Sequence, residues 1–175
     1  MLKTVIEKIP RFRTALYSIY AKGAKIAIES YYRQVAEEIS SQLNSGMILD
    51  VGTGPGYLPI EIARRSPTTR VVGIELVSKL VRMAQENSAR SGVADRLHFE
   101  IGDGAKLPFR DNSYDIVTST GVLHTLKEPV KVMNECYRVL KPNGEMWIYD
   151  PAKVSSGIDM KRWKASFTLW EIFVY

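Results

Sequence analysis

The 175-residue chain is poor in the residues that build disulfides and metal sites, since it has one cysteine and two histidines. The lone Cys136 excludes an internal disulfide, and no cluster of candidate ligands has metal-site spacing, so we predict no bound metal. Cys136 lies in a stretch with helical periodicity, where a buried thiol usually serves as a small apolar side chain. This cysteine usage fits a reducing compartment, and we predict a cytoplasmic location.

Long apolar runs are also missing. The first eight residues carry charges where a secretory signal needs an apolar core, so no signal peptide is predicted. The most apolar stretch, residues 167–175, is far shorter than the roughly 20 residues that span a bilayer. The net charge of +5 favours an anionic partner, but the basic residues are scattered. A solvated basic surface is therefore the preferred interpretation, and nucleic-acid binding is not expected.

What the chain does contain is a repeated alternation of strand and helix patterns. Helical periodicity is found over about residues 25–43, 58–65 and 78–90. A fourth helix ends before Pro142, and its predicted apolar face is formed by Val130, Met133, Tyr137 and Leu140. Short apolar runs predict five strands, at 47–51, 71–75, 97–101, 114–119 and 145–149. The alternation predicts an α/β fold, a doubly wound, mainly parallel sheet with helices on both faces, which binds ligands beyond the carboxyl ends of its strands.

The first unusual feature at a strand end is the glycine-rich turn Asp50-Val51-Gly52-Thr53-Gly54-Pro55-Gly56. Glycine permits a tight turn and lets a ligand approach the backbone closely. A dinucleotide-binding loop has the spacing G-x-G-x-x-G, whereas Tyr57 stands at the position of its third glycine. Asp50 also places a negative charge where a pyrophosphate would lie, so a ligand with a positive centre fits better.

Acidic residues follow the next two strands as well. Glu75 ends the second strand, where a carboxylate can accept hydrogen bonds from both hydroxyls of a ribose; a solvated acid is the alternative. Asp103 follows the third strand and can accept a hydrogen bond from an exocyclic amine such as that of adenine, or simply form an Asp-Gly turn with Gly104. Three acids at consecutive strand ends, together with the glycine turn, predict a nucleoside site.

These motifs, with Leu107-Pro108-Phe109 and residues 138–144, resemble the successive motifs of class I S-adenosylmethionine-dependent methyltransferases. The resemblance covers about residues 47–151. Its nearest subgroup is the small-molecule methyltransferases, including those of ubiquinone and menaquinone biosynthesis. It implies a Rossmann-like fold and S-adenosyl-L-methionine as cofactor, with S-adenosyl-L-homocysteine as product. The implied reaction is in-line transfer of a methyl group to a small-molecule or lipid-like acceptor.

The resemblance also assigns cofactor-binding roles. The methionine part is expected against the glycine turn, the ribose at Glu75, and adenine beside Leu76 and Asp103. The residues after the fourth strand are expected near the transferable methyl. Two N-terminal tyrosines are expected to close the pocket, although core packing is the preferred role for at least one. The predicted residues are Asp50, Gly52, Thr53, Gly54, Gly56, Glu75, Leu76, Asp103, Gly104, Ser119, Thr120, Gly121, Tyr20 and Tyr31.

His124 is the candidate general base, because it follows the fourth strand near the expected methyl position and histidine titrates near neutral pH. A structural role at the pocket wall or at a helix start is the preferred alternative. The methyl group of a sulfonium is already activated, so alignment of the acceptor alone can lower the barrier by roughly 7–11 kcal/mol.

Three segments are predicted: an N-terminal helical cap (1–45), a cofactor-binding core (46–151) and a C-terminal helix (152–175). The family sheet has seven strands, and its last two are expected to be absent here. The explanations left open are a truncated chain, a naturally short enzyme and a homodimer formed through the C-terminal helix, with peripheral membrane contact as a weaker alternative. The alternative function is a non-catalytic module that binds S-adenosylmethionine or a partner.

Overall fold

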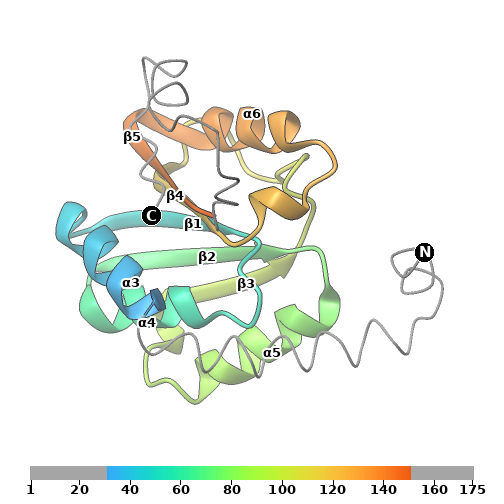
Figure 1. Ribbon diagram of the computed structural model, residues 1–175. Helices are drawn as coiled ribbons and strands as arrows, with labels where there is room; N and C mark the ends of the chain where they lie inside the picture. The colour runs from blue at the N-terminus through green and yellow to red at the C-terminus, as the bar shows by residue number, and fades with distance from the viewer. Residues whose placement is uncertain (1–30, 151–175) are drawn as a thin grey trace, which may run out of the picture.

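The computed structural model describes residues 31–150, which contain a five-stranded sheet with the order β3-β2-β1-β4-β5. All four pairs of neighbouring strands are parallel. The strand order reverses between β1 and β4, and this is the switch point at which parallel sheets bind ligands (Figure 1). The strands are β1 (Gly46–Val51), β2 (Thr69–Glu75), β3 (Leu97–Ile101), β4 (Tyr114–Thr120) and β5 (Leu140–Tyr149). The predicted α/β fold with five parallel strands is confirmed.

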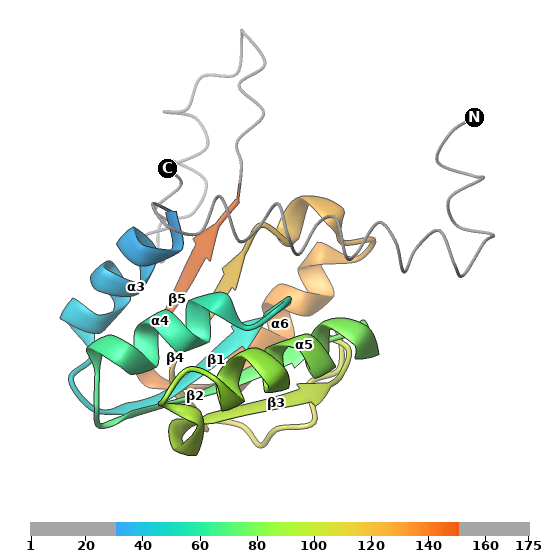
Figure 2. The same cartoon turned by 90° about the horizontal axis from the view of Figure 1, so that it is seen from below.

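Helices cover both faces of the sheet. Three of them, α3, α4 and α5, lie on one face, and α6 lies on the other (Figures 1 and 2). Two short 3₁₀ helices, η1 (Ala94–Arg96) and η2 (Leu123–Thr125), precede β3 and follow β4. The α-helices are α3 (Tyr31–Gln42), α4 (Tyr57–Arg65), α5 (Ser78–Ala89) and α6 (Pro129–Val139).

Alternate residues of the strands pack into different hydrophobic clusters on the two faces of the sheet, because successive side chains of a strand point to opposite faces. Ile48 of β1 packs in a cluster with α3 and α4 residues such as Ile39 and Ile62. Its neighbour Leu49 packs in the other cluster, with α6 residues such as Val139. All of these side chains are fully buried.

The buried face of α6 differs from the predicted one. Val132, Cys136 and Val139 face the core, whereas Val130 and Tyr137 are 69% and 61% exposed. Both sets have helical spacing, so apolar content alone does not say which one faces the sheet. Leu140 is buried as the first residue of β5 and does not belong to the helix. The predicted apolar face included Leu140 as a helix residue, and for this reason the wrong face of α6 was predicted to be buried. Cys136 is buried, as predicted.

β5 begins earlier than predicted, directly after α6. Residues 142–144, which directly follow the predicted end of the helix, lie inside it, and Asn143 has a φ of +65°. The pairing with β4 shifts register here, since Tyr114 lies opposite Leu140 but Ile116 lies opposite Glu145. This part of β5 is therefore a bulge, and regular pairing begins at Glu145, as predicted.

The connection between β3 and β4, residues 102–113, contains no helix and is held in place by Arg138 of α6. The Arg138 guanidinium donates hydrogen bonds to the carbonyl oxygens of Leu107 (3.0 Å) and Phe109 (2.8 Å). It also forms ion pairs with Asp111 and Glu135, both at 2.7 Å. One side chain thus satisfies backbone groups that a crossover helix would have paired within itself.

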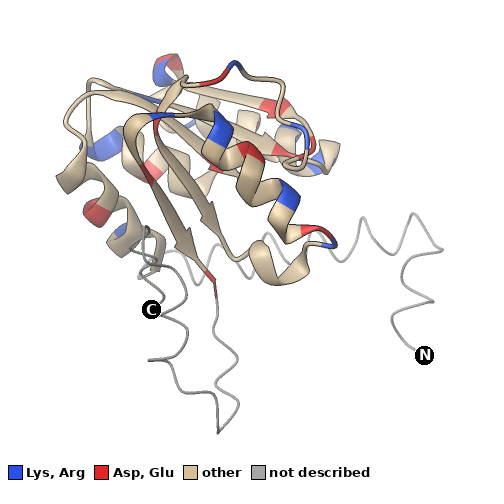
Figure 3. Cartoon of the chain, turned by 90° about the horizontal axis from the view of Figure 1, so that it is seen from above, with Lys and Arg blue, Asp and Glu red and all other residues tan. Residues whose placement is uncertain are grey.

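Charged side chains of both signs are interspersed on α6 (Figure 3). The Lys131 amine lies 2.6 Å from the Glu128 carboxylate, and Arg138 pairs with Glu135. On this helix the structure agrees with a solvated, mixed-charge surface. Within residues 31–150, no helix has the length and apolar character to cross a membrane. In the same range, no group of three or more metal-binding side chains comes together.

Of the predicted segments, the structure describes the core and only part of the N-terminal cap, namely α3. The predicted C-terminal helix (152–175) and Tyr20 lie outside the described residues. The division into three segments stays a prediction.

Candidate functional site

The glycine turn follows β1 and leads into α4. Gly52, Gly54 and Gly56 have φ values of +76°, +54° and +77°, in the left-handed region that favours glycine. The backbone amides of Gly52 and Thr53 both donate to the carbonyl oxygen of Ile74, at 2.8 and 3.1 Å. The turn is therefore fixed to the carboxyl end of the neighbouring strand β2.

The three glycines have different steric surroundings. A Cβ atom at Gly52 would lie 2.4 Å from the Val122 side chain, and one at Gly56 would lie 2.8 Å from Ala84 Cβ. A Cβ at Gly54 would meet no atom of the described residues within 4 Å. Gly52 and Gly56 are thus required by packing within the protein, whereas Gly54 faces open space at the rim of the sheet.

Glu75 is directed at this turn from the end of β2. Its carboxylate accepts hydrogen bonds from the backbone amides of Gly54 (3.1 Å) and Val77 (3.0 Å). Each carboxylate oxygen has a further lone pair, so the group retains the capacity to accept bonds from two ligand hydroxyls. The next residue, Leu76, is 68% exposed and offers an apolar surface beside Glu75. The structure brings these residues together; their contacts with a cofactor stay a prediction.

Asp50 is buried beneath the turn, with 2% of its surface exposed. Burial raises the pKa of this carboxyl to about 7, and the nearby charge of Glu75 acts in the same direction, while the neighbouring Thr53 hydroxyl opposes them. A positively charged ligand group would favour the ionised form of Asp50 and so bring its pKa down again.

We expect Asp50→Asn to remove a pH dependence of stability. In the folded protein the pKa lies near 7 and in the unfolded chain near ~3.9, so the folded state binds the extra proton between these values. The stability contributed by the protonated group is complete below the lower value and is lost as pH rises towards 7. Urea unfolding should show the free energy of wild type falling relative to the variant by about 1.4 kcal/mol per pH unit between pH 5 and 6.5.

The matched control for this experiment is Asp95→Asn, because Asp95 is an exposed acid in η1. This control should track wild type at every pH. An Asp50→Asn curve parallel to that of wild type would show that the buried carboxyl is ionised throughout, contrary to our expectation.

The ends of β3 and β4 lie beside the turn. Asp103 forms the predicted Asp-Gly turn, because its Oδ1 accepts from the Ala105 amide at 2.9 Å. A Cβ atom at Gly104 would lie 3.0 Å from Val51 Cγ1, so this glycine approaches the end of β1 closely. The Ser119 hydroxyl donates to the carbonyl oxygen of Val51 at 2.9 Å and joins β4 to the same point.

Two threonine hydroxyls of β4, those of Thr118 and Thr120, are buried without a hydrogen-bond partner among residues 31–150. Thr120 is at the carboxyl end of the strand. Gly121 follows it with a φ of +69°, and a Cβ atom there would meet no atom within 4 Å in the part of the chain that the structure describes. A buried hydroxyl without a partner is costly, so Thr120 marks a place where a ligand atom or a water would be stabilised.

His124 and Asp150 form a pair at the rim. Asp150 Oδ2 accepts the His124 backbone N–H at 2.9 Å, and Oδ1 contacts the ring atom Nδ1 at hydrogen-bonding distance. Sequence reasoning missed Asp150. The signal that identified Glu75 and Asp103 is an acidic residue at or just after the carboxyl end of a strand. Asp150 has the same signal, because it directly follows β5.

Tyr31 reaches the same region from α3. Its ring packs edge-on against Tyr32 (5.7 Å between centroids) and Tyr149 (6.5 Å). Burial, together with the charges of Asp150 and Glu38, raises the pKa of the Tyr31 phenol, which therefore stays protonated. The structure shows aromatic packing for Tyr31, and closure of a cofactor pocket by this residue stays a prediction.

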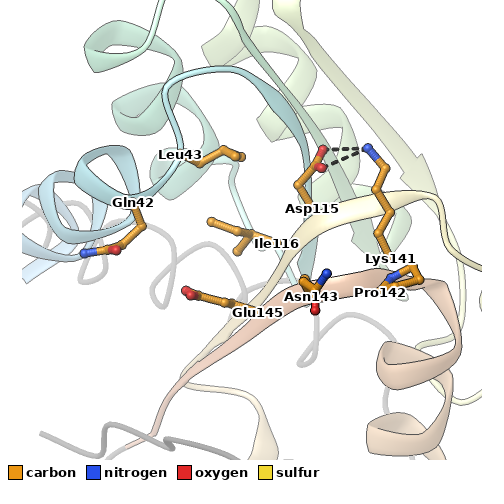
Figure 4. Close-up of a pocket in the computed structure, with 9 residues that line it drawn as sticks. Gln42, Leu43, Asp115, Ile116, Lys141, Pro142, Asn143 and Glu145 are labelled. Atoms are coloured by element: carbon orange, nitrogen blue, oxygen red, sulfur yellow. Dashed lines mark hydrogen bonds and ion pairs between the residues drawn. The ribbon is translucent and has the colours of Figure 1, made fainter.

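A pocket of about 180 Å³ lies elsewhere, where α3 ends and β5 begins. Leu43, Ile116 and Glu145 line it, and the Lys141 amine binds both Asp115 carboxylate oxygens at 2.9 Å (Figure 4). None of the predicted site residues within 31–150 lines this pocket. It lies near the amino-terminal end of β4 and so is separate from the rim that carries the glycine turn.

Comparison with known proteins decides the family. A family model described as a methyltransferase domain matches residues 43–173, three quarters of the chain. The chain belongs to the class I S-adenosylmethionine-dependent methyltransferases. The cofactor of this family is S-adenosyl-L-methionine, as predicted.

Individual relatives are more distant. The chain is 29% identical over 135 residues to the ubiquinone/menaquinone biosynthesis C-methyltransferase UbiE of Geotalea daltonii, covering 77% of this chain and 57% of the relative. It is 30% identical over 126 residues to the demethylmenaquinone methyltransferase of Lactobacillus johnsonii, covering 71% and 52%. The chain thus spans a little over half the length of these methyltransferases.

Solved structures give the same fold. An S-adenosyl-L-methionine-dependent methyltransferase structure from Methanococcus maripaludis superposes with a TM-score of 0.73 at 26% identity, over 77% of this chain and 62% of that one. The cyclase SpnF superposes with a TM-score of 0.61 at 26% identity, over 65% and 43%. This fold therefore also occurs in a protein named for a reaction other than methyl transfer.

Proposed function

We propose that this methyltransferase domain transfers a methyl group from S-adenosylmethionine to a small-molecule or lipid-like acceptor. The observation that carries the proposal is the open space in front of Gly54, bordered by a Glu75 carboxylate that the backbone amides of Gly54 and Val77 hold in place. Glycine at this position allows a ligand to lie directly against the backbone.

The residues present fit the cofactor by their chemistry. Glu75 provides acceptors for ribose hydroxyls, and the exposed Leu76 provides an apolar surface for a base. Asp50 is a buried acid that a cationic group would ionise, and Thr120 holds a buried hydroxyl in need of a partner. Bound there, S-adenosylmethionine would supply a methyl group that its positively charged sulfur has already activated.

The work of the protein is then alignment and exclusion of water. The segment after β4 is fixed in two ways, by the Gly121 amide bonded to Tyr149 O (2.7 Å) and by Val122 packed on Gly52. A rigid rim of this kind can hold an acceptor in line with a methyl group, and alignment alone is worth roughly 7–11 kcal/mol in favourable cases.

The acceptor class is supported by relatives named for menaquinone and ubiquinone biosynthesis. We therefore choose reduced demethylmenaquinone as the first acceptor to test with the full chain. Isothermal titration is expected to show binding of S-adenosylmethionine, and release of S-adenosylhomocysteine is expected once the acceptor is added. Absence of cofactor binding would overturn the proposal.

A second candidate is a module that binds the cofactor or a partner without transferring a methyl group, and the similarity to SpnF, a protein named for a cyclisation, supports keeping it as an alternative. It predicts cofactor binding without turnover. Formation of S-adenosylhomocysteine with any acceptor in a screen of small-molecule extracts would exclude it.

A further inference from the structure

The contact between His124 and Asp150 holds both the backbone and the ring of the histidine. One carboxylate oxygen accepts the His124 backbone N–H at 2.9 Å, and the other contacts ring Nδ1. The Asp150 side chain is 14% exposed, whereas that of His124 is 52% exposed. The acid is thus sheltered at the end of β5 while the imidazole extends into the accessible rim.

The short helix η2 carries His124 next to the predicted cofactor turn. Val122, two residues before His124, lies against Gly52 so closely that a Cβ there would be 2.4 Å from Val122 Cγ2. The Gly121 amide bonds to Tyr149 O, one residue before Asp150. The pair is therefore built on two strand ends that are joined to each other and to the glycine turn.

The donor and acceptor roles in this contact follow from elementary chemistry. A carboxylate only accepts hydrogen bonds, so Nδ1 must carry the proton that lies between the ring and Asp150. In a neutral imidazole the other nitrogen, Nε2, then has a free lone pair. Tyr31 also lies near Asp150, but its phenol stays protonated and does not take up this proton.

We propose that Asp150 is a positioning residue that holds His124 with its proton on Nδ1, so that Nε2 serves as the base for the methyl acceptor. This inference rests on the proposed function. It narrows the acceptor to a molecule whose reacting atom loses a proton during transfer, such as a hydroxyl, a protonated amine or an acidic carbon.

The step balances with the residues and molecules already named. An electron pair of the acceptor atom forms the bond to the methyl carbon, the carbon–sulfur bond breaks, and its electron pair stays on sulfur, giving S-adenosylhomocysteine. The proton of the acceptor atom moves to His124 Nε2. The resulting imidazolium is stabilised by the Asp150 carboxylate and later releases the proton to solvent.

The tautomer can be measured without any acceptor by ¹⁵N NMR of the imidazole rings. The chain has two histidines, so a His98→Gln background leaves His124 as the single signal. At pH 8 we expect protonated Nδ1 and unprotonated Nε2. Asp150→Asn should reverse this, because the amide can donate to Nδ1, whereas Asp95→Asn should change nothing. A protonated Nε2 in the parent, or no change with Asp150→Asn, would overturn the inference.

Turnover with reduced demethylmenaquinone tests the base itself. We expect His124→Ala and Asp150→Asn each to lower kcat by about 10²–10⁴-fold with cofactor affinity unchanged. The double variant should be no slower than His124→Ala, since the two residues act as one unit. Added imidazole should partly restore His124→Ala only. If His124→Ala has the same kcat as wild type, the inference is wrong.

These readouts separate the two proposals. A wild-type chain that binds no S-adenosylmethionine contradicts the proposed function, whatever the tautomer. A chain that binds the cofactor but does not methylate this acceptor contradicts the quinone as substrate, and the NMR result then decides on the role of Asp150 by itself.

Discussion

Gly54→Arg is expected to weaken binding of S-adenosylmethionine by more than about 100-fold, equivalent to about 3 kcal/mol. The side chain would project into the open space in front of the turn, where an added Cβ meets no atom of residues 31–150 within 4 Å. Its positive charge would also repel a sulfonium. Isothermal titration of the cofactor into wild type and variant measures the effect.

The chain offers a matched control in Gly92, which has a φ of +78° and where a Cβ atom would likewise meet no atom of the described range within 4 Å. Arginine at either position carries the same backbone strain, about 1–2 kcal/mol. Gly92→Arg should therefore lose similar stability in urea unfolding but keep cofactor affinity. Equal affinity in the two variants would show that the space at Gly54 is not the cofactor site.

Glu75→Ala is expected to have an effect as large or larger, about 10²–10⁴-fold in cofactor affinity. Each hydrogen bond from a ribose hydroxyl to the charged carboxylate is worth about 1.5–3 kcal/mol, and the site would lose two. The variant also leaves the amides of Gly54 and Val77 without their acceptor, which loosens the turn. Cofactor titration and urea unfolding together measure both consequences.

A cofactor analogue without ribose hydroxyls separates the two consequences. Wild type should bind the analogue as weakly as Glu75→Ala binds the cofactor. The Glu75→Ala variant should bind the analogue about as weakly as it binds the cofactor. Glu100→Ala, which removes an acid on the neighbouring strand, should leave affinity unchanged. If wild type binds the analogue and the cofactor equally, Glu75 does not hold the ribose.

The order of elements was predictable from the sequence because local patterns determine it. Strands such as 47–51 and 71–75 are buried on both faces in a parallel sheet, so each is a short run of apolar residues. Such a run can be recognised from the local sequence alone. Glu75 and Asp103 were identifiable as rim residues for the same reason, since parallel strands bring their carboxyl ends to one edge.

Features that depend on contacts between elements distant in the sequence were not predictable in this way. α6 has two apolar stripes, and only packing against β1 and β4 shows that the one through Val132, Cys136 and Val139 is buried. The bulge at 142–144 depends on register with β4. The partnership of His124 with Asp150 joins residues 26 positions apart, a separation that no local pattern reports.

The attachment of residues 102–113 to α6 through Arg138 has a thermodynamic consequence. Asp103 and Gly104 lie at one end of this connection, and its carbonyl groups bond to a guanidinium that an outer helix supplies. We therefore expect a ligand that orders Asp103 to favour the folded form of α6 as well, and by reciprocity a partner that stabilises α6 to increase the affinity for the ligand. On this expectation the outer surface of the domain and its binding rim are thermodynamically coupled.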